Sequence, residues 1–245
     1  MSRLSDLRIK IFADGADLAG MVKMRAHPLV RGFTTNPSLM RKAGINNYET
    51  FARKVVAAIP ALPVSFEVFA DDFPTMLVQA RIIASWGRNI NVKIPVVTTQ
   101  GLFAGDVIRA LSAEGIKLNV TAVMTLDQVE AIADALDPDT PAIVSVFAGR
   151  VADTGVDPVP HMRACAAALR RRPKAELLWA SPRELLNLFQ ADEAGCGIIT
   201  MTNDLIAKCD LIGKDLTEYS RETVQMFHTD ATSSGFQIEP ATAAA

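Results

Sequence analysis

Short apolar runs rich in β-branched residues alternate with segments of helical periodicity along almost the whole chain. The runs have the length and composition of buried strands, and the segments between them space their apolar residues as amphipathic helices do. The pattern predicts eight strands, at Arg8–Ala13, Gly32–Thr35, Val64–Ala70, Ile90–Ile94, Lys117–Thr121, Ala142–Phe147, Glu176–Ala180 and Gly197–Thr200.

A helix-like segment follows each predicted strand, and the clearest examples are Phe73–Trp86 and Leu126–Leu136. Thr125 stands before the second of these helices with Gln128 three residues later, which is the sequence signature of a capping box. Strands that are almost continuously apolar and separated by helices indicate a parallel sheet covered on both faces. Eight such units fit a single (β/α)8 TIM barrel. The periodicity alone leaves a doubly wound open sheet as the alternative.

No linker or low-complexity stretch interrupts the chain before residue 238, so we expect one TIM-barrel domain over residues 1–238. The last residues, EPATAAA at 239–245, are typical of a disordered tail. Leu216–Thr232 reads as an additional C-terminal amphipathic helix, which packs either on its own barrel or on a neighbouring subunit.

Composition narrows the possible partners. The formal charge of −2 and the pI of about 5.9 imply no basic face, so nucleic acid is not an expected partner. The first ten residues are too charged for a signal peptide, and no uncharged run reaches the length of a membrane span. Cys165, Cys196 and Cys209 show neither metal-ligand spacing nor a disulfide pattern, which suggests reduced thiols in a cytoplasmic protein.

Polar residues gather where the predicted strands end, which is where barrel enzymes carry their chemistry. Lys93 is the most unusual of them, because it lies inside the apolar run NVKIPVV, where an unpaired ammonium group is costly to bury. The others at or just after strand ends are Asp14, Thr34, Asn36, Glu67, Asn119, Thr121, Ser145, Arg150, Ser181 and Arg183.

Each of these residues also has an ordinary structural explanation. Asp14 suits a turn, and Asn36 before a proline suits a loop in which Ser38 caps the next helix. A lysine in a strand more often pairs or snorkels than reacts, and Arg150 could be a surface charge. The set is more informative than its members, because a lysine held among carboxylates on parallel strands is one way to hold a reactive amine.

Five motifs resemble the transaldolase family, which includes fructose-6-phosphate aldolase-like members and belongs to the Schiff-base aldolases. They are FTTNPSLM at 33–40, VKIP at 92–95, LNVTAVMT at 118–125, SVFAGR at 145–150 and WASPRE at 179–184. They occur in the family's order and cover about residues 11–202, which is most of the chain. The resemblance implies a TIM barrel.

The resemblance also implies roles for the matched residues. Lys93 is the expected Schiff-base nucleophile, and Asp14 is expected to exchange a proton with the sugar C4 hydroxyl. Glu67 is expected to assist dehydration through a water molecule that Thr121 helps to position. The remaining matches imply substrate contacts from Thr34, Asn36, Asn119, Ser145 and Phe147, and a phosphate site formed by Arg150, Ser181 and Arg183.

Two positions bear on which branch of the family the chain resembles. Fructose-6-phosphate aldolase-like members tend to have glutamine in place of Glu67 and tyrosine in place of Phe147. The residues present favour a transaldolase that transfers a dihydroxyacetone unit between sedoheptulose 7-phosphate or fructose 6-phosphate and an aldose phosphate. Alternatives are an aldolase that releases free dihydroxyacetone, a transaldolase of a specialised sugar pathway, and a sugar-phosphate-binding barrel without catalysis.

The resemblance has further implications for partners. It implies no cofactor, since the protonated imine is the electron sink, and the scattered His27, His161 and His228 do not resemble a metal-ligand set. It implies sugar-phosphate substrates, a homo-oligomer and a role in carbohydrate metabolism such as the pentose phosphate pathway.

Overall fold

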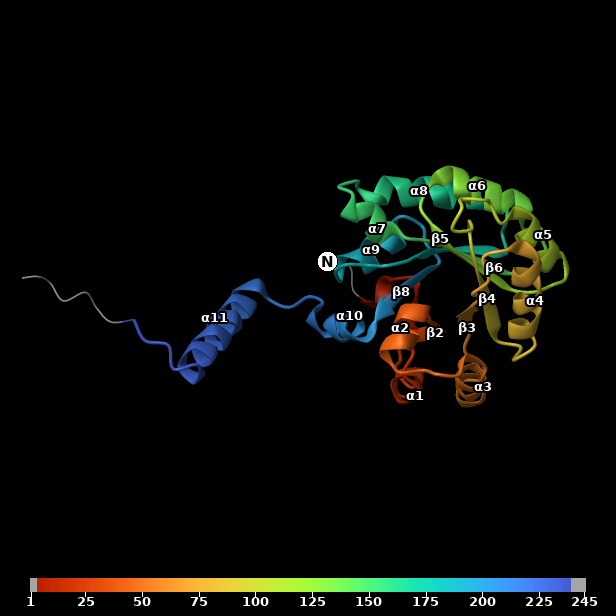
Figure 1. Ribbon diagram of the computed structural model, residues 1–245. Helices are drawn as coiled ribbons and strands as arrows, with labels where there is room; N and C mark the ends of the chain where they lie inside the picture. Colours follow the sequence, from red (N-terminus) through yellow and green to blue (C-terminus); the bar gives the residue numbers. More distant parts are fainter. Residues whose placement is uncertain (1–3, 239–245) are drawn as a thin grey trace, which may run out of the picture.

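Eight parallel strands close into a barrel in chain order in the computed structural model, which describes residues 4–238 (Figure 1). The closed order confirms the predicted (β/α)8 TIM barrel and excludes the open sheet. The strands are β1 Lys10–Asp14, β2 Val30–Thr34, β3 Val64–Glu67, β4 Ile90–Pro95, β5 Leu118–Val123, β6 Ala142–Val146, β7 Ala175–Trp179 and β8 Ile198–Thr202.

Helices connect the strands and surround the barrel, except for the C-terminal α11 (Figure 1). They are α1 Leu18–Arg25, α2 Pro37–Lys42, α3 Tyr48–Ala58, α4 Phe73–Ala84, α5 Gly105–Ala113, α6 Leu126–Ala135, α7 Ala148–Asp153, α8 Pro158–Leu169, α9 Leu186–Glu193, α10 Asn203–Ala207 and α11 Leu216–Ser233. Short 3-10 turns lie at Leu4–Asp6 and Lys208–Leu211.

The predicted strands are all present, with shifted ends. The largest difference is β3, which ends at Glu67 rather than at Ala70, because its pairing with β4 ends where Glu67 meets Lys93. The predicted capping box of α6 is confirmed: the Thr125 hydroxyl accepts from the Gln128 amide, and the Gln128 side chain accepts from the Thr125 amide. Residues 239–245 lie outside the described residues, so their disorder stays a prediction.

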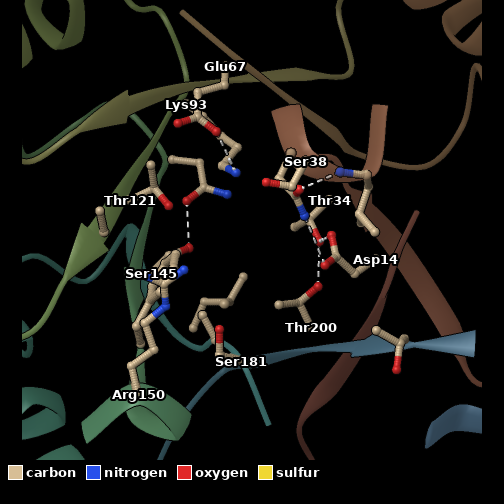
Figure 2. A pocket seen from close by; sticks show the side chains of 18 of the residues that line it. Asp14, Thr34, Ser38, Glu67, Lys93, Thr121, Ser145, Arg150, Ser181 and Thr200 are labelled. Atoms are coloured by element: carbon tan, nitrogen blue, oxygen red, sulfur yellow. Dashed lines mark hydrogen bonds and ion pairs between the residues drawn. The ribbon is translucent and has the colours of Figure 1, made fainter. Parts of the chain in front are cut away.

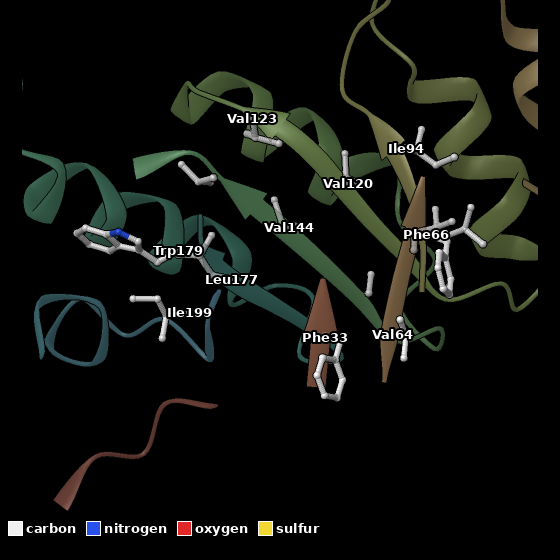
Figure 3. Packing of buried hydrophobic residues seen from close by; sticks show 14 of the residues in the cluster. Phe33, Val64, Phe66, Ile94, Val120, Val123, Val144, Leu177, Trp179 and Ile199 are labelled. Atoms are coloured by element: carbon white, nitrogen blue, oxygen red, sulfur yellow. The ribbon is translucent and has the colours of Figure 1, made fainter. Parts of the chain in front are cut away.

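The apolar core has two parts. Side chains on the outer face of the strands, including Phe33, Phe66 and Trp179, pack under the helices (Figure 3). A smaller cluster fills the inside of the barrel and consists of Phe12, Ile143, Leu178, Ala180 and Ile198. Gly32 makes room for it, because a Cβ at that position would lie 2.6 Å from the Phe12 ring. Burial of both layers is the main force that closes the barrel.

The inner face of the barrel changes character towards the carboxyl ends of the strands. Buried polar side chains replace apolar ones there: Ser65, Lys93, Asn119, Thr121, Ser145 and Thr200. Buried polar groups are costly unless they are paired, so this layer requires an explanation other than packing.

Helix α11 extends away from the barrel (Figure 1). The helix predicted near Leu216–Thr232 is therefore present, but none of its residues is buried, and Leu216, Val224 and Phe227 are exposed. Packing of this helix on its own barrel is thus excluded within the described chain.

Two further features concern the cysteines and the length of the helices. Cys165, Cys196 and Cys209 are free and buried, and burial raises the pKa of each thiol, to about 12 for Cys196. Within residues 4–238, none of the helices is both long enough and apolar enough to cross a membrane.

Candidate active site

A pocket of about 650 Å³ opens at the carboxyl ends of the strands, and every strand of the barrel contributes to its wall (Figure 2). All of the site residues predicted from the sequence line this one cavity. They are Asp14, Thr34, Asn36, Glu67, Lys93, Asn119, Thr121, Ser145, Phe147, Arg150, Ser181 and Arg183. The structure therefore brings the whole predicted set together, whereas the role of each residue stays a prediction.

The Lys93 amine lies at the bottom of the pocket, and its residue is only 7% exposed. Its Nζ is 3.0 Å from the Glu67 carboxylate and donates to the carbonyl oxygen of Thr35 at 2.9 Å. These two oxygens offset the free-energy cost of burying the ammonium group. Valine and isoleucine side chains alone could not do so. β4 supplies the amine and the adjacent β3 supplies the carboxylate, since Glu67 and Lys93 are register partners.

The Asp14 carboxyl occupies the wall formed by β1 and β2. Its Oδ1 accepts from the Thr34 hydroxyl at 2.8 Å and its Oδ2 from the Asn36 amide at 3.4 Å. Burial raises the pKa of Asp14 above its ordinary value, although the Thr34 hydrogen bond, the charge of Lys93 and the Asn36 hydrogen bond oppose the shift. A carboxyl group in this state suits proton exchange with a bound hydroxyl.

A chain of hydrogen bonds joins polar residues of β3, β5 and β6 along the wall of the pocket. The Ser145 hydroxyl donates to the Asn119 carbonyl at 2.6 Å, and the Asn119 amide donates to the Ser65 hydroxyl at 3.0 Å. All three residues are buried, so their side chains have defined positions.

Thr121 reaches the pocket from a bulge in β5. The register between β5 and β6 shifts between Val120 and Val123, and Ala122 has a left-handed φ of 60°. Bulges of this kind redirect a side chain at a strand end.

The far side of the pocket from Lys93 carries two guanidinium groups (Figure 2 labels Arg150). The Arg150 guanidinium carbon lies 5.1 Å from the centre of the Phe147 ring, in cation–π contact. Arg183 forms a two-point ion pair with Asp153, a residue at the end of α7 that the sequence did not single out. Arginine pairs readily with two oxygens of one phosphate, so this wall suits a phosphate group.

The backbone between these arginines is tightly constrained. Ser181 has a left-handed φ of 58°, and its carbonyl lies directly against Gly149. A Cβ on Gly149 would be 1.6 Å from that carbonyl oxygen, so only glycine fits there.

Several lining residues were missed by the sequence analysis, among them Ser38, Lys42, Thr200 and Thr202. Thr200 on β8 forms a short hydrogen bond with the Thr34 hydroxyl and so extends the group around Asp14. A signal for Thr200 was present in the sequence, since it is the last residue of the predicted strand Gly197–Thr200 and therefore lies at the carboxyl end of a strand.

The expectation that Ser38 caps the helix after β2 is wrong. Ser38 does not cap α2; Asn36 does, because its side-chain oxygen accepts from the Leu39 amide at 2.9 Å. Asn36 thus serves as helix cap and as a pocket residue at the same time.

Within residues 4–238, no three His, Cys, Asp or Glu side chains lie close enough to hold a metal ion.

Comparison with known proteins gives a consistent result. The family model described as Transaldolase/Fructose-6-phosphate aldolase matches residues 11–238. The chain is 35% identical to a "Probable transaldolase" of Dehalococcoides mccartyi over 79% of this chain and 86% of that protein. It is 34% identical to a "Probable transaldolase" of Herpetosiphon aurantiacus over 88% of this chain and 92% of that protein.

A solved structure supports the fold alone. Thiamine phosphate pyrophosphorylase from Pyrococcus furiosus superimposes with a TM-score of 0.53 at 8% identity, covering 80% of this chain and 86% of that one.

Proposed function

The chain belongs to the transaldolase/fructose-6-phosphate aldolase family, and we propose that it is a transaldolase that works through an imine on Lys93. In this proposal a dihydroxyacetone unit passes from a ketose phosphate, such as sedoheptulose 7-phosphate or fructose 6-phosphate, to an aldose phosphate. The observation that carries the proposal is the Lys93 amine, 3.0 Å from the Glu67 carboxylate in a pocket that also contains Asp14.

The first step is formation of the imine. Lys93 must be neutral to attack the C2 carbonyl, and the Glu67 carboxylate is close enough to accept its proton. The amine adds to C2 to give a carbinolamine. Protonation of the C2 hydroxyl, from Glu67 through a water molecule near Thr121, then releases water and leaves a protonated imine.

The second step is cleavage of the C3–C4 bond. Asp14 accepts the proton of the C4 hydroxyl, the C4 oxygen becomes a carbonyl, and the bonding electron pair moves through C3 to the imine nitrogen. The aldose phosphate leaves, and the enamine of dihydroxyacetone stays on Lys93. Attack of this enamine on the acceptor aldehyde reverses the sequence, with Asp14 returning the proton to the new hydroxyl.

The arginine wall is proposed to bind the phosphate group of donor and acceptor. Arg150 and Arg183, with the hydroxyl of Ser181, offer several donors to one phosphate. Phosphate then competes with Asp153 for the guanidinium group of Arg183.

Two residues favour transfer over release of free dihydroxyacetone. Phe147 offers no hydroxyl to orient a water molecule for hydrolysis of the imine that protonation of the enamine gives, and Glu67 is a carboxylate where aldolase-like members tend to have glutamine. An aldolase that releases dihydroxyacetone is the second candidate, and sustained multiple-turnover release without any acceptor would replace transaldolase as the proposed activity.

The test of the imine is borohydride reduction with fructose 6-phosphate and no acceptor, followed by intact-mass analysis and peptide mapping. We expect a reduced three-carbon adduct on Lys93 and none in Lys93→Met. A wild-type enzyme that forms no adduct with this donor or with sedoheptulose 7-phosphate, or a Lys93→Met variant with full activity, would refute the mechanism.

We also propose that the protein is a cytoplasmic homo-oligomer. Support for the homo-oligomer comes from α11, whose apolar side chains Leu216, Val224 and Phe227 remain exposed within residues 4–238. Removal of residues 214–245 should lower the molecular mass measured by light scattering to that of a smaller assembly.

A further inference from the structure

We propose that Tyr48 is a positioning residue for Glu67, holding its main chain in place of a missing strand partner. The inference rests on the role proposed above for the Glu67 carboxylate. It concerns a side chain that lies outside the pocket lining and outside the motifs shared with the family.

The tyrosine hydroxyl satisfies both main-chain groups of one residue. Tyr48 Oη accepts a hydrogen bond from the Glu67 amide at 2.7 Å and donates one to the Glu67 carbonyl oxygen at 2.9 Å. An N–H and a C=O of the same residue normally bind the neighbouring strand of a parallel sheet. Here a single hydroxyl group takes the place of that strand.

The need for such a substitute follows from the pairing of β3. The amides of Val64 and Val68 are directed to the β4 side. They donate to the carbonyls of Asn89, which directly precedes β4, and of Lys93. Main-chain groups alternate along a strand, so those of Glu67 are directed to the opposite side, towards β2.

β2 has no main-chain partner left to offer at that point. Its register with β3 ends where Thr34 meets Ser65, and the next residue, Thr35, reaches the Ser65 carbonyl with its hydroxyl instead. Chain direction then changes, and Pro37 at the start of α2 has no N–H to donate. Without Tyr48, the amide and carbonyl of Glu67 would lose their partners at the edge of the active site.

The tyrosine is itself held firmly. It is the first residue of α3, directly after Asn47, whose side chain caps the helix by accepting from the Thr50 amide at 2.8 Å. Its ring meets those of Phe66 and Trp86 edge-on, with centroids 6.0 Å and 5.5 Å away. The hydroxyl group therefore has a fixed position, and burial raises the pKa of Tyr48, so the hydroxyl keeps the proton that it donates.

The position of the Glu67 main chain decides where its carboxylate lies. Glu67 is the last residue of β3, and among the described residues only Tyr48 hydrogen-bonds its main chain on the β2 side, while β4 holds the neighbouring Val68. The carboxylate contacts Lys93 Nζ at 3.0 Å, a distance suited to direct proton transfer. Displacement of a catalytic group by about 1 Å can cost on the order of 100-fold in rate.

Tyr48→Phe tests the inference, because it removes the hydroxyl and keeps the ring in the aromatic cluster. Tyr219→Phe is the matched control, since Tyr219 is the other tyrosine of the chain and lies on α11, away from the barrel. We expect Tyr48→Phe to lower kcat by about 10-fold or more with KM for the ketose phosphate changed less than about 3-fold. We also expect slower appearance of the borohydride-trapped adduct on Lys93, and Tyr219→Phe should match the wild type.

A double-mutant cycle with Glu67→Gln separates positioning from a general loss of stability. If Tyr48 acts through Glu67, Tyr48→Phe should have little further effect on kcat in the Glu67→Gln background. Equal losses of kcat in both backgrounds, or an unchanged kcat in Tyr48→Phe, would overturn the inference.

Hydrogen exchange of the Glu67 amide, measured by NMR, gives a readout that does not depend on activity. Exchange in Tyr48→Phe should be at least about 10-fold faster than in the wild type, because the amide loses its acceptor. Unchanged exchange would overturn the positioning role even if the wild type is an active transaldolase. Faster exchange in a protein that forms no Lys93 adduct would instead uphold the contact and refute the proposed function.

Discussion

Replacement of Gly149 by alanine should damage the phosphate side of the pocket while leaving the Lys93 side intact. The added Cβ would lie 1.6 Å from the carbonyl oxygen and 2.6 Å from the carbonyl carbon of Ser181. Both are main-chain atoms, so no side-chain rotation can relieve the contact. Ser181 is already in a left-handed conformation, which leaves little freedom to adapt.

The size of the effect follows from this geometry. Real Cβ contacts are essentially never shorter than 3.0 Å, so α7 and the segment after β7 must separate by at least about 1.4 Å. This movement carries Arg150 and Arg183 apart, since Arg150 directly follows Gly149 and Arg183 is two residues after Ser181. We expect overpacking to lower the free energy of unfolding by about 1–3 kcal/mol. We expect kcat/KM to fall by about 10- to 100-fold, mainly through KM.

The assay compares a phosphorylated donor with its unphosphorylated sugar. Gly149→Ala should lose kcat/KM for fructose 6-phosphate but much less for fructose, because only the former uses the arginine wall. Gly15→Ala is the control, as its added Cβ would meet no atom within 4 Å. Equal losses for both donors, or a Gly149→Ala enzyme with unchanged KM for fructose 6-phosphate, would refute the reasoning.

Two further substitutions probe individual groups of the pocket. Asp14→Asn should lower transfer by about 100- to 10,000-fold yet raise the Tm at pH 7. Burial raises the pKa of Asp14 in the folded state above its ordinary value of 3.8. The folded protein therefore loses stability as the pH rises from 3.8 through the raised pKa and Asp14 ionises. The gain in Tm of Asp14→Asn should vanish in melts below pH 3.8, where Asp14 is protonated in both states. Phe147→Leu removes the cation–π contact with Arg150 and should raise KM for phosphorylated donors about 2- to 5-fold in steady-state assays, with the Lys93 adduct still formed; an unchanged KM would contradict the contact.

The fold could be predicted from the sequence because its signals are local and repeated. Each strand is a short apolar run, and each helix shows its own period and often its own cap, as Thr125 and Gln128 do for α6. The end of β3 could not be placed, because the sequence stays apolar from Val68 to Ala70 after the pairing with β4 has stopped at Glu67. Pairing is a property of two strands, and the composition of one of them does not record it.

The residues that line the pocket could largely be predicted for a topological reason. In a barrel, the carboxyl ends of all parallel strands meet at one rim, so a residue at a strand end is placed by its position in the chain. Lys93 and Glu67 illustrate this, because adjacent strands and a common register bring them within 3.0 Å. The orientation of α11 was not predictable, because the apolar face of an amphipathic helix does not indicate which surface it packs against.

The contacts that hold pocket residues in place could not be predicted from the sequence, and the reason is physical. Tyr48 and Asp153 each hold a pocket residue through a side chain that comes from another element. Their sequence surroundings are ordinary: Tyr48 begins a helix and Asp153 ends one. What makes each of them important is an unsatisfied donor, acceptor or charge left by a different part of the chain. Such needs exist only once the barrel has closed, so the sequence does not reveal the side chains that support the pocket from behind, even where it reveals most residues of the lining.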